Sequence, residues 1–294
     1  MPANYYVEDL GEGPNLVVTD AWSDDIARAL AAGGIEGLTL NYARGFKGGD
    51  LRFIDGLPLR RLNLLARTID DLGVLYTLGG TLESLNLTAG SAARLDLSRF
   101  PHLVDLGTDL AHVFESIHSA TSLRSLYLGG YAWADLQPLG GLIELESLQL
   151  KDRPAVESLD GLQNFPKLTS LQVAGASKLR DLTALRDQAP RLKSLDFRGS
   201  TKFSELDDMS SLANLELLDI SQCGSIYSLR PLTSLARLAE LFMSESTRIE
   251  DSDLSPLLAL PKLRELSIQP RKSYQPSVFE IKTVIESRDH ESPE

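Results

Sequence analysis

Several residue types that report on compartment or partner are scarce in this sequence. Cys223 is the single cysteine among 294 residues, which excludes an intramolecular disulfide framework. Basic residues are outnumbered, because 29 Lys and Arg stand against 41 Asp and Glu, for a formal net charge of −12. Surfaces that bind phosphate groups are basic. We therefore expect neither nucleic acid nor an anionic membrane as a partner.

Long apolar segments are missing too. No run approaches the roughly 20 apolar residues of a membrane-spanning helix. The first nine residues, Met1-Pro2-Ala3-Asn4-Tyr5-Tyr6-Val7-Glu8-Asp9, lack the basic and apolar regions of a signal peptide. These features predict a cytoplasmic protein that does not contact a membrane, and we expect it to be a monomer.

Motifs that carry catalysis or bind cofactors are also lacking. The sequence has no GxxxxGK[ST], GxGxxG, GxSxG or HExxH element. His112, Glu115 and His118 lie within a predicted short helix over 109–118, but their spacing does not suit a metal site. We expect these three side chains to face solvent. The sequence thus predicts no enzyme, no cofactor and no metal.

What the sequence has in abundance is one repeated frame. In Leu168-Thr169-Ser170-Leu171-Gln172-Val173 the first, fourth and sixth residues are apolar and the others are polar. The middle apolar residue of each copy stands at 38, 62, 85, 106, 126, 148, 171, 195, 218, 241 and 266. The spacing is 20 to 25 residues. A fixed period in this range is typical of a solenoid.

The alternation within each copy has a period of two, which places its apolar residues on one face of a β-strand. One strand cannot bury that face alone, whereas stacked copies form a continuous core. The segments between copies include Ser228-Leu229-Arg230-Pro231-Leu232 and Asp253-Leu254-Ser255-Pro256-Leu257. Proline opposes long helices there and favours turns or single 3₁₀ turns.

On these residues the chain resembles the leucine-rich repeat family, in its short-repeat SDS22-like and internalin-like class. The resemblance implies an α/β fold: a right-handed curved solenoid with a parallel concave sheet of about eleven strands and short turn or 3₁₀ returns on its convex side. We divide it into an N-terminal strand and helix cap (1–34), the repeat array (35–270), and a C-terminal capping helix with a frayed tail (271–294). The fourth copy is irregular, because Thr108 replaces its third apolar residue.

The family usually places a hydrogen-bonded asparagine three residues after the third apolar position. This sequence departs from that pattern, with Arg67, Gly90, Tyr131, Arg153, Ala176, Ser200, Cys223 and Ser246 at those positions. The resemblance implies that Cys223 is buried and hydrogen-bonded at that turn. With no histidine near it in sequence to lower its pKa, we expect it to be inert.

Residues between the apolar positions face away from the core and are the candidate contact residues. In the last third of the array they combine an aromatic ring and a leucine with surrounding charges, a composition typical of an interface centre and its rim. The predicted protein-binding residues are Asp196, Arg198, Leu217, Asp219, Glu240, Phe242 and Glu265. Tyr127 and Lys151 form a second candidate. The alternative is that these are ordinary solvated residues.

The sequence therefore favours a non-catalytic module that binds a protein, for which the acidic candidates favour a basic partner. A cytoplasmic adaptor or an inhibitor of the immunity or antitoxin type would fit this interpretation. The alternative is an enzyme, or a regulator of one, whose activity lies in the array around Cys223 or the irregular fourth repeat.

Overall fold

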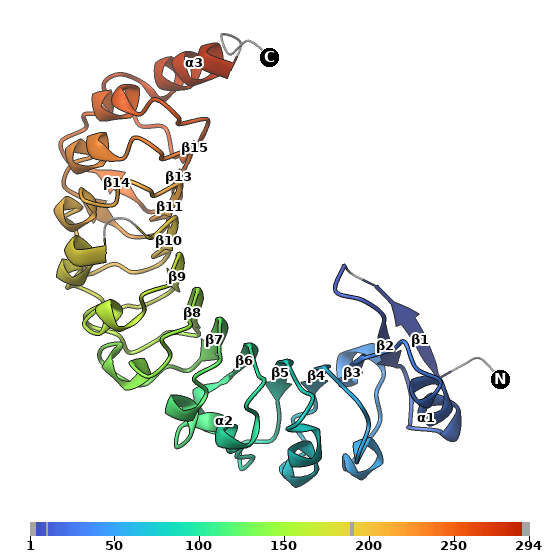
Figure 1. Cartoon of the computed structure of the whole chain (residues 1–294). Coiled ribbons are helices and arrows are strands. Elements are labelled where there is room, and N and C mark those ends of the chain that lie inside the picture. The colour runs from blue at the N-terminus through green and yellow to red at the C-terminus, as the bar shows by residue number, and fades with distance from the viewer. Residues whose placement is uncertain (1–3, 10, 189–190, 290–294) are drawn as a thin grey trace. The chain divides into compact units, whose positions relative to one another are not determined.

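Parallel strands with short returns between them make up most of this chain (Figure 1). The computed structural model describes residues 4–9, 11–188 and 191–289. They divide into two compact units, Met1–Leu128 and Gly129–Glu294. In each unit the strands line one side and the short helices of the returns lie on the other.

The first unit begins with an antiparallel pair and continues in parallel. Strand β1 (Tyr5–Glu8) pairs with β2 (Asn15–Val18). Helix α1 (Asp24–Ala31) leads to the parallel strands, which follow in chain order: β3 (Gly37–Asn41), β4 (Arg61–Leu65), β5 (Ser84–Thr88), β6 (Asp105–Asp109) and β7 (Ser125–Gly129), the last ending at the unit boundary. Helix α2 (Leu110–Val113) follows β6 directly.

The second unit repeats the same arrangement. Its main strands are β8 (Ser147–Lys151), β9 (Ser170–Val173), β10 (Ser194–Asp196), β11 (Leu217–Asp219), β13 (Glu240–Met243) and β15 (Glu265–Ile268). They pair in parallel in that order. Two short strands, β12 (Ser225–Ile226) and β14 (Arg248–Ile249), pair within the returns. Helix α3 (Val278–Asp289) ends the described chain.

The register confirms the predicted repeat frame. In the second unit Leu148, Leu171, Leu195, Leu218 and Leu241 are successive partners across the strands. All five are fully buried. Ser170 and Gln172, which flank Leu171, lie on the opposite face and are half-buried. The eleven predicted strands all form, and the main sheet has the additional strands β1 and β2.

Short 3₁₀ turns occur in the returns, as the proline pattern predicts. They cover 42–44, 52–54, 73–78, 97–99, 117–119, 137–139, 162–164, 183–188, 207–209, 230–234 and 255–259. Proline occupies one of the first two positions in three of them, as Pro138, Pro231 and Pro256. Within the described residues, no helix is both long and apolar enough to span a bilayer.

Three local expectations are wrong. His112 does not face solvent, because it is buried with its Nδ1 3.1 Å from the carbonyl oxygen of Ala93. Glu115 and His118 are exposed as expected. The predicted helix over 109–118 is divided into α2 and a separate 3₁₀ turn at 117–119. Ser246 is exposed, and Thr247 takes the hydrogen-bonding position instead, with its hydroxyl donating to the carbonyl of Ile220 at 2.6 Å.

Candidate functional site

The predicted contact residues of the second unit lie on the polar face of its last four main strands. We call Asp196, Arg198, Leu217, Asp219, Glu240, Phe242 and Glu265 the β10–β15 patch. The register pairs Leu217 with Glu240, and Glu240 with Glu265, in one row across the strands. A second row pairs Asp196 with Asp219, and Asp219 with Phe242. Arg198 lies two residues beyond the end of β10.

Asp196 is the most buried member of the patch, with 9% of its surface exposed. Its carboxylate accepts hydrogen bonds from the side chain of Gln172, from the Arg198 backbone N–H at 3.0 Å and from Arg198 Nη2 at 2.5 Å. A carboxylate this buried needs such partners, because unpaired burial of charge is strongly unfavourable.

Arg198 joins two strands through its guanidinium. Its Nε lies 3.6 Å from Asp219 Oδ2, in addition to the bond to Asp196. The hydrogen bond to Asp196 is the main cause of a raised pKa of Arg198, which burial partly offsets. About half of the arginine side chain stays exposed. Asp196, Asp219 and Arg198 together therefore carry one net negative charge within reach of solvent.

The apolar members of the patch, Leu217 and Phe242, are both half-buried. They lie on neighbouring strands but not opposite each other, because Leu217 faces Glu240 and Phe242 faces Asp219. Phe242 is one strand across and two residues along from Leu217, a separation of roughly 8 Å that an aromatic side chain can still bridge. The two side chains thus share one area of the polar face that is bordered by carboxylates.

A basic margin, which sequence reasoning missed, lies where these strands begin. Lys193, Arg237, Lys262 and Arg264 line a hollow together with Glu216 and Glu240. Arg264 Nη2 lies 3.1 Å from Glu240 Oε1, which neutralises one of the predicted acidic rim residues. The sequence does contain a signal for this margin, because basic residues precede the strands in Arg191-Leu192-Lys193 and Lys262-Leu263-Arg264. The patch is therefore acidic in its middle and basic at this margin.

The second predicted pair, Tyr127 and Lys151, is divided between the two units. Tyr127 lies in the middle of β7 in the first unit, and Lys151 ends β8 in the second. Both side chains are half-buried. Each is therefore a candidate contact residue within its own unit.

Cys223 has the environment of a structural cysteine. It is fully buried; its thiol donates to the carbonyl of Phe197 at 3.2 Å, and its backbone N–H donates to the Thr247 hydroxyl at 2.9 Å. Burial raises the pKa of the thiol to about 12. A nucleophile needs an accessible thiolate, and this environment opposes both conditions.

The irregular fourth repeat contains a buried hydroxyl group. Thr108, which replaces an apolar residue of the frame, is buried, and its hydroxyl has no hydrogen-bond partner in the described part of the chain. Among the described residues no group of three or more His, Cys, Asp or Glu side chains could hold a metal ion.

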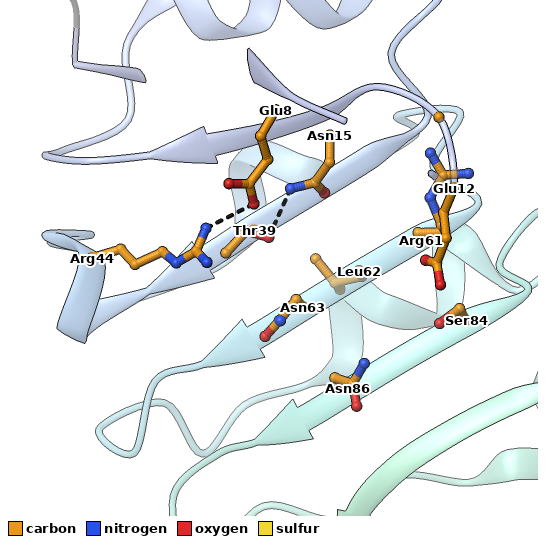
Figure 2. A pocket seen from close by; sticks show the side chains of 11 residues that line it. Glu8, Glu12, Asn15, Thr39, Arg44, Arg61, Leu62, Asn63, Ser84 and Asn86 are labelled. Carbon is orange, nitrogen blue, oxygen red and sulfur yellow. Dashed lines mark hydrogen bonds and ion pairs between the residues drawn. The ribbon is translucent and has the colours of Figure 1, made fainter. Parts of the chain in front are cut away.

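A hollow in the first unit lies beneath the loop that joins β1 to β2 (Figure 2). Its volume is about 170 Å³. The Asp9 carboxylate closes the loop by accepting from the N–H groups of Gly11 and Gly13 at 2.8 and 3.1 Å. Arg61 Nη2 donates to the carbonyl of Pro14 at 3.2 Å, which links the loop to β4.

Polar side chains surround this hollow. Asn63 and Asn86 are partners in the register of β4 and β5 and form its floor. Glu8 and Arg44 bind each other at 2.7 Å on one side, and Glu12 and Arg61 lie on the other (Figure 2). The sequence could not predict this hollow, because it depends on where the loop between β1 and β2 packs over strands that begin at Arg61 and Ser84.

Comparisons with known proteins agree with this architecture. No protein-family profile matches the sequence. The disease resistance protein RPP5 of Arabidopsis thaliana is 31% identical over 175 residues, which are 50% of this chain and 12% of that protein. The chain thus spans only a small part of the length of that curated relative.

Three solved structures share the fold. An internalin (inlF) of Listeria monocytogenes is 21% identical with a TM-score of 0.55, over 87% of this chain and 70% of that one. A chain of the mouse RP105/MD-1 complex is 22% identical with a TM-score of 0.58, over 80% of this chain and 42% of that one. A chain of the TLR13–ssRNA13 complex is 20% identical with a TM-score of 0.54, over 80% of this chain and 39% of that one. Together with the repeats of the sequence and the register of the strands, these likenesses identify the chain as a protein of the leucine-rich repeat fold.

Proposed function

We propose that this chain is a non-catalytic recognition module that binds a protein partner through the β10–β15 patch. The observation that carries the proposal is the pair of half-buried apolar side chains, Leu217 and Phe242, held on adjacent strands and bordered by ordered charges. Apolar centres with charged rims are typical of protein interfaces. Because Asp196, Arg198 and Asp219 are already positioned by one another, little side-chain ordering is needed on binding.

The charges of the patch suit a partner with a defined distribution of charge. Asp219 favours a basic group opposite the middle of the patch, and Glu265 favours one opposite its β15 end. The margin of Lys193, Arg237 and Lys262 favours acidic groups where the strands begin. Such a partner would bind in one orientation. An adaptor or an inhibitor would both use this surface in the same way.

Relatives support a protein partner in general terms. One structural relative, RP105, is in complex with the protein MD-1, whereas another, TLR13, is in complex with single-stranded RNA. The net charge of −12 opposes RNA as the partner of this chain. The enzyme alternative around Cys223 has little support, because that thiol is buried and hard to ionise.

Affinity capture tests the proposal. The immobilised wild-type chain and a Leu217→Ala/Phe242→Ala variant would be exposed to a lysate of the native organism, and the bound proteins would be compared by quantitative mass spectrometry. A partner retained by the wild type and lost from the variant supports the patch. Tyr227→Ala is the matched control, since Tyr227 is an aromatic side chain with 58% exposure outside the patch. Equal capture by all three chains would contradict the proposal.

A further inference from the structure

The hollow beneath the β1–β2 loop contains hydrogen-bonding groups that the protein itself does not use. Asn63 and Asn86 are exposed, and within the described residues neither side-chain amide has a hydrogen-bond partner. Each offers two donors and one acceptor oxygen. Gly107 lies beyond Asn86, and a Cβ there would lie 2.3 Å from Asn86 Oδ1. The absence of that Cβ lets Asn86 take its place on the floor.

Arg61 is the uncommitted cation of this site. Its guanidinium has five donors, one of which binds the carbonyl of Pro14. In the described part of the chain no carboxylate lies within ion-pair distance of it, whereas Arg44 is neutralised by Glu8 and also contacts the Tyr6 hydroxyl at 3.2 Å. Glu12 lies beside Arg61 without pairing with it (Figure 2). The remaining donors of Arg61 are therefore available to a ligand.

We infer that this hollow binds a carboxylate carried by a segment of polypeptide. The carboxylate would accept charge-assisted hydrogen bonds from Arg61, whose planar fork matches carboxylate geometry. The amides of Asn63 and Asn86 would pair with backbone N–H and C=O groups of the same segment, since a carboxamide has the donors and acceptors of a peptide group. The site lies in the first unit, so this inference does not depend on the β10–β15 patch.

Replacement of Glu12 should change the affinity for the ligand in the opposite direction to replacement of Arg61. Its carboxylate repels a ligand carboxylate at Arg61, so Glu12→Gln should strengthen binding by about threefold. Arg61→Gln should weaken binding by about tenfold, the loss expected for a charge-assisted hydrogen bond. A ligand that instead used Glu12 as its anchor, such as a cationic peptide, would be weakened by Glu12→Gln.

The experiment is a titration of the isotope-labelled chain with small blocked peptides, followed through the NMR signals of the Asn63 and Asn86 side-chain amides. Acetyl-Gly-Asp-Gly-amide carries an internal carboxylate, acetyl-Gly-Asn-Gly-amide is its neutral isostere, and acetyl-Gly-Gly-Gly carries only a terminal carboxylate. We expect both carboxylate peptides, or one of them, to shift these signals with an affinity at least about tenfold above that of the neutral peptide. The stronger one identifies the source of the carboxylate.

Arg60→Gln is the matched control, because Arg60 is the neighbouring arginine but pairs with Glu83 outside the hollow. It should leave the affinity unchanged. If Arg61→Gln lowers the melting temperature, Asn86→Asp provides a second test, since an added carboxylate on the floor should weaken binding at constant shape. Shifts of equal size and affinity with the neutral peptide would overturn the inference. So would a lack of any shift, or weaker binding by Glu12→Gln.

Discussion

Arg198 connects two neighbouring strands, with its Nη2 2.5 Å from Asp196 Oδ2 and its Nε 3.6 Å from Asp219 Oδ2. Removing the arginine leaves the carboxylate of Asp196 at 9% exposure with fewer partners. We therefore expect Arg198→Met to lower the free energy of unfolding by about 1 kcal/mol, a modest value because the arginine is half exposed.

A double-mutant cycle with Asp196→Asn, followed by urea denaturation, measures this coupling. The neutral amide no longer needs the cation, so Arg198→Met should have a smaller effect in the Asp196→Asn background. Strictly additive effects would mean that the ion pair contributes nothing to stability.

The buried thiol of Cys223 makes a prediction about pH. Burial raises its pKa to about 12 in the folded chain, whereas the pKa of a cysteine in an unfolded chain is about 8.5. Above that lower value only the unfolded chain loses the proton, so stability that is complete below about pH 8.5 is progressively lost as the pH rises towards 12. The slope should reach about 1.4 kcal/mol per pH unit.

Cys223→Ser removes this titration while it keeps a hydrogen-bonding group. The difference in unfolding free energy between wild type and variant should therefore shrink or reverse between pH 8.5 and 10, while other titrating groups cancel in the comparison. In the native state the wild-type thiol should also react slowly with an aromatic disulfide reagent. Fast reaction, together with a pH-independent difference, would restore Cys223 as a catalytic candidate.

The repeat frame predicts which face of the strands carries stability. Leu171 and Leu218 are fully buried, and truncation to alanine should cost about 2–5 kcal/mol for each because it leaves a cavity. Ser170→Ala and Ser194→Ala, on the polar face, should change the unfolding free energy by about 0.5 kcal/mol or less. Denaturant midpoints of the four variants provide the measurement, and larger effects at the serines would contradict the register.

Sequence reasoning succeeded where structure depends on a local repeat. The alternation around Leu171 sets its own strand and face, and Pro231 and Pro256 set short returns, without information from distant residues. It failed by one position at Ser246. Gln222 and Glu245 both adopt left-handed backbone conformations, but the hydrogen-bonding residue follows Gln222 directly as Cys223 and follows Glu245 one residue later as Thr247. One extra residue in a turn leaves no signal in the apolar pattern.

The sites were less predictable for a related reason. The faces of Asp196, Asp219 and Phe242 follow from the alternation, but the side-chain contacts between Gln172, Asp196 and Arg198 depend on rotamers across two strands. The hollow at Arg61 needs a loop from outside the repeats to pack above it. Such contacts join positions that no periodic pattern relates.

The segment before the repeats is proposed to protect the first repeat strand. Deletion of residues 1–34 removes α1 and the partner strand β2, which exposes the edge of β3 and its buried Leu38 and Leu40. Unpaired edges promote association, so the truncated chain should form oligomers or precipitate. Light scattering at several concentrations measures this. A monomeric truncated chain with cooperative unfolding would show that the segment is not a cap.

The β10–β15 patch makes the most specific prediction, once a partner has been captured. Phe242→Ala should weaken binding by more than about 1–2 kcal/mol, the range of an interface hot spot, with little change in the fold because Phe242 is only half-buried. Reversing a carboxylate of the patch should mainly slow association with a basic partner, and more at low salt than at high salt. Asp219→Lys tests this at the centre of the patch, but it also places a cation beside Arg198. Glu265→Lys, at an exposed position, is therefore the cleaner variant. Binding kinetics at two salt concentrations provide the measurement. Unchanged affinity in Phe242→Ala and in both reversals would exclude the patch, and substitutions of Tyr127 and Lys151 would then be tested, each in its own unit.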